Sequence, residues 1–206
     1  MSEAHLTMGA HSAPPMEARP FAMPSKKLAM WLFIMSDVMT FAACVVVYAF
    51  LRNATPDWPR PFHSVTSVTI MTIIMLTSGL TMLMALNVGK AADKAGASRW
   101  MMITAALGVI FTILHIRDWA GMMNQGVGLF QNPWGPAAFG AAFYSITGFS
   151  LLHISVGTIA LIVIVIRYQR GRYNADDIEL FNLFWQFISL VWLFIVPLVY
   201  LMNLAR

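Results

Sequence analysis

The sequence predicts an all-α integral membrane protein whose single bundle contains five transmembrane helices. Hydrophobic residues make up 59% of the 206-residue chain, more than a soluble domain can bury, so most of the chain requires lipid as its solvent. Five apolar stretches are each long enough to cross a hydrocarbon core of about 30 Å at a rise of about 1.5 Å per residue. The predicted helices cover about residues 28–51, 65–88, 100–123, 137–166 and 180–205.

Few charges interrupt these stretches. The first holds only Asp37, the second and fourth hold none, and the third is uncharged until Arg117 and Asp118 near its end. The fifth is uncharged and contains Pro197, which lacks an N–H group. We expect this proline to leave the Leu193 carbonyl without its helical partner and to bend the helix.

The predicted domain organisation is a flexible tail over residues 1–27 and a transmembrane domain over residues 28–206. The tail is rich in small residues, proline and methionine and has no apolar core of the length that a cleavable signal peptide needs. Its two histidines, His5 and His11, are interpreted as bystanders. Short connections, without an inserted domain or an internal repeat, disfavour the repeat-built secondary transporters.

Lysine and arginine are distributed unequally between the two ends of the predicted bundle. The N-terminal side carries nine: Arg19, Lys26, Lys27, Lys90, Lys94, Arg99, Arg167, Arg170 and Arg172. The opposite side carries four: Arg52, Arg60, Arg117 and Arg206. By the positive-inside rule, the N-terminus is cytoplasmic and the C-terminus periplasmic. Because these residues are scattered through loops without forming a patch, no nucleic-acid partner is expected.

Two ionisable residues are predicted near the middle of the membrane. Asp37 lies about 15 Å along its helix from Lys27, and His153 about 21 Å from Arg167, so both fall at similar depth. A carboxylate there must be protonated, paired or facing protein. Asp37 is therefore either a neutral carboxyl bonded to a neighbouring helix or a functional one facing a partner subunit, a lipid cleft or a proton route. His153 fits packing and hydrogen bonding better than metal ligation.

Other polar residues lie near the helix ends. His115, Asp118 and Trp119 share one helical face by their spacing, although an anchor in the headgroup layer explains the charged group equally well. Glu179 opens the last helix on the predicted cytoplasmic side, where a negative charge suits a helix N-terminus.

No redox or catalytic centre is predicted within this chain. Cys44 is the single cysteine, which excludes a disulfide framework and cysteine-based zinc or iron–sulfur sites. Haem or copper needs several ligands converging at one depth, and the sequence does not provide them. The sixteen methionines are spread along the chain without clustering and are interpreted as core or lipid-facing residues.

Four motifs occur in one order along the helices. They are a serine–acid pair in the aromatic run Trp31–Asp37, a Leu-Gly-x-x-Phe segment ending in an acid–aromatic pair over Leu107–Trp119, a Thr-Gly segment with His153 over Phe143–Gly157, and Glu179 followed by Trp185–Leu193. Together they resemble subunit III of the haem–copper oxidases, in its short five-helix form. Ser150, Gln186 and Ser189 depart from the histidine, histidine and aspartate that are usual in that family.

The resemblance implies a non-catalytic subunit of a proton-pumping terminal oxidase, which reduces oxygen to water in a bacterial inner membrane. Subunits I and II, and also a small subunit IV or a larger supercomplex, are the implied partners. Haem and copper are expected in the partner subunits, with phospholipid bound beside this chain. The resemblance links four residues to proton or lipid function: Asp37, Asp118, His153 and Glu179. It assigns five to subunit packing: Trp185, Gln186, Trp192, Gly148 and Gly157.

Two alternatives remain open from the sequence. One is an accessory subunit of a nitric oxide reductase or respiratory supercomplex, which would share the fold and most motifs. The other is a small proton-coupled transporter that uses Asp37 and His153 as a relay. The quinol or cytochrome c donor, the haem type and the lipid identity are not indicated by these residues.

Overall fold

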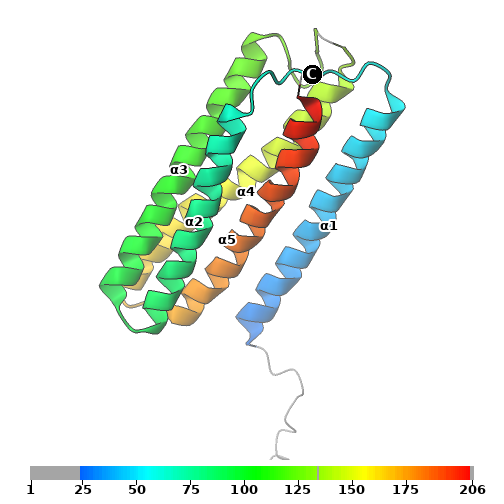
Figure 1. Cartoon of the computed structure of the whole chain (residues 1–206). Helices are drawn as coiled ribbons and strands as arrows, with labels where there is room; N and C mark the ends of the chain where they lie inside the picture. The colour runs from blue at the N-terminus through cyan, green and yellow to red at the C-terminus, as the bar shows by residue number, and fades with distance from the viewer. Residues whose placement is uncertain (1–23, 134, 205–206) are drawn as a thin grey trace, which may run out of the picture.

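Five long helices lie side by side in the computed structural model, which describes residues 24–133 and 135–204 (Figure 1). Within these ranges there is no strand, only an isolated bridge between Phe62 and Leu204. The helices are α1 (Ser25–Ala54), α2 (Thr66–Lys90), α3 (Lys94–Asn124), α4 (Ala138–Gln169) and α5 (Ala175–Ile195). Five helical segments are long and apolar enough to cross a membrane, with α5 and its continuation counted as one. The predicted all-α class with five spans is confirmed.

Three helices start before the predicted residues 28, 100 and 180. For α3 and α5 the reason is local capping, which hydropathy does not register, whereas α1 begins at Ser25 without a side-chain cap. At the start of α3, the Asp93 side chain accepts a hydrogen bond from the Gly96 backbone N–H at 2.9 Å. At the start of α5, Asn174 and Asp177 form a capping box, in which each side chain accepts from the other residue's backbone N–H. The charged first turns are therefore helical and not part of the loops.

Of the predicted flexible tail, only the last residues, 24–27, are among those that the structure describes. Ser25, Lys26 and Lys27 are the first residues of α1, so this part of the predicted tail is helical. Residues 1–23, with His5 and His11, lie outside the described residues.

Pro197 changes the hydrogen-bonding pattern at the end of α5 without ending the helical path. The chain continues as the π-helix η1 (Val196–Tyr200) and the short 3-10 helix η2 (Leu201–Asn203). A wider turn is the expected response where a proline has no N–H to offer the preceding turn. It places Tyr200 and Asn203 inside the bundle, both buried.

The helices are buried to different degrees. Half of the most apolar window of α5 is buried within the chain, compared with 17% of that of α1. Helix α1 lies at one edge and packs on α4 and α5, whereas α2 and α3 form an antiparallel pair against α4 and α5 (Figure 1). The core therefore lies among α2, α3, α4 and α5.

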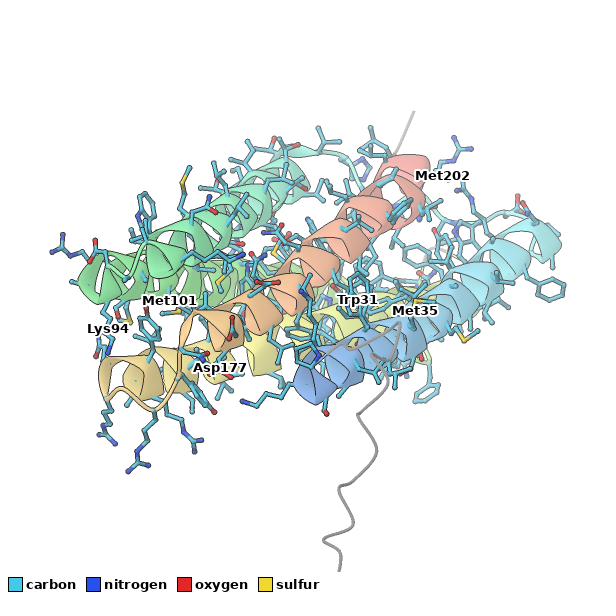
Figure 2. All side chains as sticks on the ribbon, turned by 90° about the horizontal axis from the view of Figure 1, so that it is seen from below. Trp31, Met35, Lys94, Met101, Asp177 and Met202 are labelled. Atoms are coloured by element: carbon cyan, nitrogen blue, oxygen red, sulfur yellow. The ribbon has the colours of Figure 1, made fainter. Side chains whose placement is uncertain are left out.

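Apolar side chains cover both the exposed faces of the helices and the faces buried inside the bundle, as expected for a protein in lipid. Trp31 and Met35 on α1 are 42% and 56% exposed, whereas Met101 on α3 is fully buried (Figure 2). Methionine thus serves on outer faces and in the core alike.

Candidate functional site

The two predicted mid-membrane residues meet in the structure. Asp37 on α1 and His153 on α4 bring Oδ2 and Nε2 to 3.1 Å; the Asp37 side chain is 9% exposed and that of His153 12%. Among the described residues, no other group forms a hydrogen bond with Asp37 Oδ2, which leaves the imidazole as its polar neighbour. The sequence placed these groups at similar depth on different helices; their adjacency comes from the packing of α1 on α4.

The other imidazole nitrogen determines the chemistry of this pair. His153 Nδ1 lies 2.8 Å from the backbone carbonyl oxygen of Phe149, one turn earlier on α4. A carbonyl oxygen only accepts hydrogen bonds, so Nδ1 carries a proton and donates it. A neutral His153 then presents a lone pair on Nε2 to the Asp37 carboxyl group.

Two lone pairs facing each other at 3.1 Å in an apolar region repel, so a proton belongs between Asp37 and His153. It resides either on the carboxyl oxygen, beside a neutral imidazole, or on Nε2, beside a carboxylate. Both arrangements have zero net charge and both avoid an isolated ion in lipid. The geometry is that of a neutral pair that can hold and release one proton.

Aromatic rings enclose this pair. The imidazole of His153 lies against Phe149 at a centroid distance of 4.5 Å and against Phe41 at 5.6 Å. Phe41 is itself buried and also contacts Phe187 of α5. These rings pack against the imidazole and hold its orientation.

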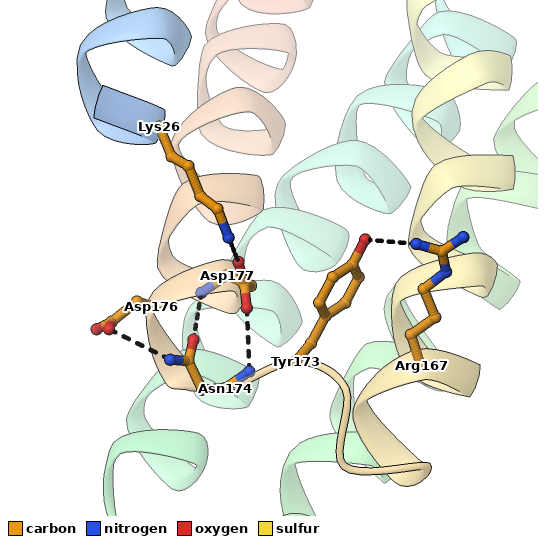
Figure 3. Close-up of polar contacts among 6 residues, drawn as sticks. All are labelled: Lys26, Arg167, Tyr173, Asn174, Asp176 and Asp177. Atoms are coloured by element: carbon orange, nitrogen blue, oxygen red, sulfur yellow. Dashed lines mark hydrogen bonds and ion pairs between the residues drawn. The ribbon is translucent and has the colours of Figure 1, made fainter. Parts of the chain in front are cut away.

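Glu179 lies at the end of the bundle where α1 begins. Its carboxylate oxygens lie 2.6 Å from Lys27 Nζ and 3.1 Å from Lys90 Nζ, so it joins the start of α1 and the end of α2 to α5. Beside it, Lys26 Nζ lies 3.0 Å from Asp177 (Figure 3). We name this group the ionic clasp: Lys26, Lys27, Lys90, Asp177 and Glu179.

The clasp depends on the local chain around the start of α5. Asn174 caps the helix and holds Asp177 in place, while Tyr173 accepts a hydrogen bond from Arg167 of α4 at 3.2 Å (Figure 3). The α4–α5 turn is thereby fixed on both sides. Glu179 is therefore placed where it can pair with cations of two other helices.

Asp118 lies at the opposite end of the bundle. Its Oδ2 accepts a hydrogen bond from Ser67 of α2 at 2.5 Å, and its Oδ1 lies 3.5 Å from Arg117. On the same helix, the His115 and Trp119 rings contact each other at a centroid distance of 5.6 Å. His115 is fully buried, and Trp119 donates to Thr147 of α4. Ser67 was not singled out from the sequence, because a serine near the start of a span carries no distinguishing signal.

The aromatic residues assigned to subunit packing lie inside this chain. Trp185 and Trp192 have no exposed surface. Their indole N–H groups donate to α2, Trp185 to Ser78 at 3.1 Å and Trp192 to Thr72 at 3.2 Å. Within this chain these rings join α5 to α2.

The glycines assigned to packing also contact helices of this chain. A methyl group built on Gly157 would lie 3.0 Å from the Phe184 ring and 3.2 Å from the Trp185 ring, and one on Gly148 would lie 3.0 Å from the Trp119 ring. Each glycine lets a large ring of α5 or α3 approach the backbone of α4 closely.

The three positions that depart from the family pattern have different environments. Gln186 donates to the Gly79 carbonyl at 2.8 Å and to Asn182 at 3.2 Å, and Ser189 donates to the Trp185 carbonyl at 2.9 Å. Ser150 is buried, and its hydroxyl has no partner among the described residues. Gln186 thus keeps a role in joining α5 to α2.

No group of three or more histidine, cysteine, aspartate or glutamate side chains that could hold a metal ion occurs in the described part of the chain.

Comparison with known proteins places this bundle in a family. The family described as cytochrome c oxidase subunit III matches residues 17–204. The chain belongs to this family. Cytochrome c oxidase subunit 3 of Alkalihalophilus pseudofirmus is 33% identical over 186 residues, which are 88% of each chain. The protein of the same name from a Bacillus species is 30% identical over 209 residues, or 99% of each chain.

The chain is also similar to relatives that are named as quinol oxidase subunits instead of cytochrome c oxidase subunits. The cytochrome bo(3) ubiquinol oxidase subunit 3 of Pseudomonas aeruginosa is 28% identical over 178 residues, which are 84% of this chain and 83% of that protein. This cytochrome c oxidase subunit III family member is thus similar along nearly all its length to third subunits of both oxidase classes. The resemblance that the four motifs predicted is confirmed.

Proposed function

We propose that this chain is the third subunit of a proton-pumping haem–copper terminal oxidase, without a catalytic site of its own. It supports assembly and sustained proton uptake beside subunits I and II, which hold haem and copper. A small subunit IV or a larger respiratory supercomplex are further partners of this assembly. Family membership over most of the chain supports the oxidase context.

The proposed orientation has the N-terminus in the cytoplasm and the C-terminus in the periplasm of a bacterial inner membrane. The start of α1 and the α2–α3 and α4–α5 turns lie at one end of the bundle (Figure 1). These segments contain most of the lysines and arginines. Cytoplasmic loops are the ones enriched in these residues, which supports this orientation.

The observation that carries the proposed proton role is the Asp37–His153 contact. A buried acid and a largely buried imidazole lie 3.1 Å apart on different helices of a membrane bundle, a geometry that suits a neutral pair with one transferable proton. Such groups within membranes typically mark proton relays. We assign this pair to the supply of protons to the neighbouring redox subunit, with Glu179 at the proposed cytoplasmic entrance.

Phospholipid is proposed to bind beside the pair. An apolar groove of about 250 Å³ runs between α1 and α5, lined by residues that include Phe41, Phe187 and Leu190. Its walls are almost wholly apolar and suit an acyl chain. A chain in this groove would also keep water away from Asp37 and His153.

The test is the Asp37→Asn variant of the assembled oxidase. Asparagine keeps the size of the side chain and can donate to His153 Nε2, but it cannot release a proton at neutral pH. We expect normal assembly with a faster loss of oxygen consumption during prolonged turnover. The measurement is oxygen uptake by the purified complex over many turnovers.

Asp57→Asn provides the matched control, because Asp57 is an exposed aspartate of the α1–α2 connection. It should lose activity at the wild-type rate. Persistent wild-type activity in Asp37→Asn would reject the proton role. Proton transport by the purified chain alone in liposomes would instead favour a transporter.

A further inference from the structure

Phe41 lies one turn beyond Asp37 on α1, and residues four apart share a face of a helix. Both side chains are buried and lie on the side of α1 that packs against α4. The ring centroid of Phe41 lies 5.6 Å from that of His153 and 4.8 Å from that of Phe149. Helix α1 thus presents an acid and, one turn away, a ring that contacts the acid's partner.

The hydrogen bond of His153 to its own helix fixes only one side of the imidazole. Nδ1 donates to the Phe149 carbonyl oxygen at 2.8 Å, and the Phe149 ring stands edge-on to the imidazole at an interplanar angle of 72°. Both constraints come from α4. From α1, the Phe41 ring packs against the imidazole at an interplanar angle of 59°. The direction in which Nε2 points therefore depends on Phe41 as well as on α4.

Phe41 also lies at the boundary of the apolar groove of about 250 Å³ between α1 and α5. It lines this groove, whereas Asp37 and His153 do not. Phe187, on the α5 wall, contacts the Phe41 ring edge-on at a centroid distance of 6.4 Å. The Phe41 ring is therefore shared between the groove and the pair, and a smaller side chain here would extend the groove toward the pair.

We propose that Phe41 is a positioning residue, whose ring holds Nε2 of His153 toward the Asp37 carboxyl group and separates the pair from the groove. It carries no proton and acts through His153. Because Asp37 and Phe41 lie one turn apart on α1, this helix brings both the acid and the ring that aligns its partner to α4. The alignment rests on these contacts alone, whereas its effect on turnover rests on the proposed function.

The test is infrared spectroscopy of the purified oxidase complex that carries Phe41→Ala. Without the ring, the imidazole is free to turn away, and a carboxylate left alone in an apolar region takes up a proton. We expect the carbonyl stretch of a protonated carboxyl group without a hydrogen-bond partner, at a higher wavenumber than any carboxyl band of Asp37 in wild type. Adding Asp37→Asn should remove the band, which assigns it to Asp37. A loss of stability alone would not move it.

The loss of the ring on the groove side predicts a second change in Phe41→Ala. In D2O, the proton of the Asp37–His153 pair should exchange about tenfold faster than in wild type, the order of effect expected when aromatic contacts of ordinary strength are lost. The time course of the isotope shift in the infrared spectrum measures this rate. Phe41→Leu, which keeps most of the apolar volume, takes the place of Phe41→Ala if that variant does not assemble, and should change the band and the rate in the same directions.

Phe33→Ala is the matched control, because Phe33 lies one turn before Asp37 as Phe41 lies one turn after it. Its ring is 45% exposed, and its aromatic contact among the described residues is with Phe184 of α5. This variant should keep the wild-type band and exchange rate. The same changes in Phe33→Ala, or a wild-type band in the Phe41 variants, would overturn the proposal.

Oxygen uptake during prolonged turnover separates the positioning of His153 from the proposed proton role. Phe41→Ala should lose activity faster than wild type. The double variant with Asp37→Asn should lose it no faster than Asp37→Asn alone, because the ring acts only through the pair. A further loss in the double variant would contradict the positioning role. A changed infrared band with persistent wild-type activity would confirm the positioning and reject the proton role.

Discussion

At the residue scale, Asp37 and His153 illustrate what depth and contact each contribute. Counting residues from the flanking cations places both near mid-membrane, but it does not orient either helix about its axis. The 3.1 Å contact and the bond from Nδ1 to the Phe149 carbonyl supply that orientation. The sequence left two interpretations of Asp37 open. The structure places it in a defined pair with His153, between which the geometry requires one proton.

The shared proton makes a spectroscopic prediction. In His153→Leu, Asp37 loses its partner, and a lone carboxylate in an apolar region is strongly unfavourable. We expect Asp37 to be protonated at neutral pH in this variant, with an infrared band of a protonated carboxyl group. Adding Asp37→Asn should remove the band. A carboxylate signal at neutral pH in His153→Leu would contradict this picture.

At the element scale, α5 is held to α2 by side chains that reach across the interface. Trp185, Gln186 and Trp192 all donate hydrogen bonds to α2. They recur at spacings that place them toward one side of a helix, which the sequence could show. The sequence could not predict which neighbour they contact. In lipid, a helix face that packs inside the chain and one that packs on another subunit have the same composition.

Trp192→Ala tests this internal role. Trp192 is fully buried and contacts the Phe111 ring at 4.8 Å, so removing it leaves a cavity in the core of the chain. We expect a loss of about 3 kcal/mol in the free energy of unfolding. Thermal unfolding of the isolated chain in detergent provides the measurement.

Phe194→Ala is the control for that experiment, because Phe194 is a large aromatic of the same helix with 60% of its surface exposed. It should leave the stability of the isolated chain nearly unchanged. If Trp192→Ala reduced only the retention of partner subunits, and not the stability of the chain, the internal role would be rejected.

At the scale of the whole molecule, α1 stands apart from the other helices. It is the least buried span and packs on α4 and α5 alone among its stronger contacts. Its attachments are the Asp37–His153 contact in the middle and the ionic clasp at its start. Near its other end, Tyr48 hydrogen-bonds Asn203 of η2. Helix α1 buries little apolar surface, and polar contacts along its whole length attach it to the other helices.

Glu179→Gln should loosen the first turns of α1. The change removes the ion pairs with Lys27 and Lys90, each worth up to about 1 kcal/mol at such partly exposed positions. We expect faster hydrogen exchange over residues 25–30, and a similar effect of high salt on wild type. Hydrogen exchange with mass spectrometry measures both.

Asp176→Asn serves as the comparison, because Asp176 forms no ion pair with Lys27 or Lys90 and its one hydrogen bond among the described residues is with its neighbour Asn174. Its exchange over residues 25–30 should match wild type. Unchanged exchange in Glu179→Gln would show that apolar packing alone holds α1.

The sequence by itself determined the class, the number of spans and the family, because hydropathy and ordered motifs are properties of a linear chain. It did not determine the helix starts at Ser25, Lys94 and Ala175, where charged first turns resemble loops in composition. Only the tertiary structure decided that Asp37 meets His153, that Trp192 faces inward, and that Asp118 pairs with Ser67. The physical reason is that lipid allows apolar surface on every side of a helix. Composition therefore leaves rotation about the helix axis undetermined, and specific polar and aromatic contacts between helices determine it.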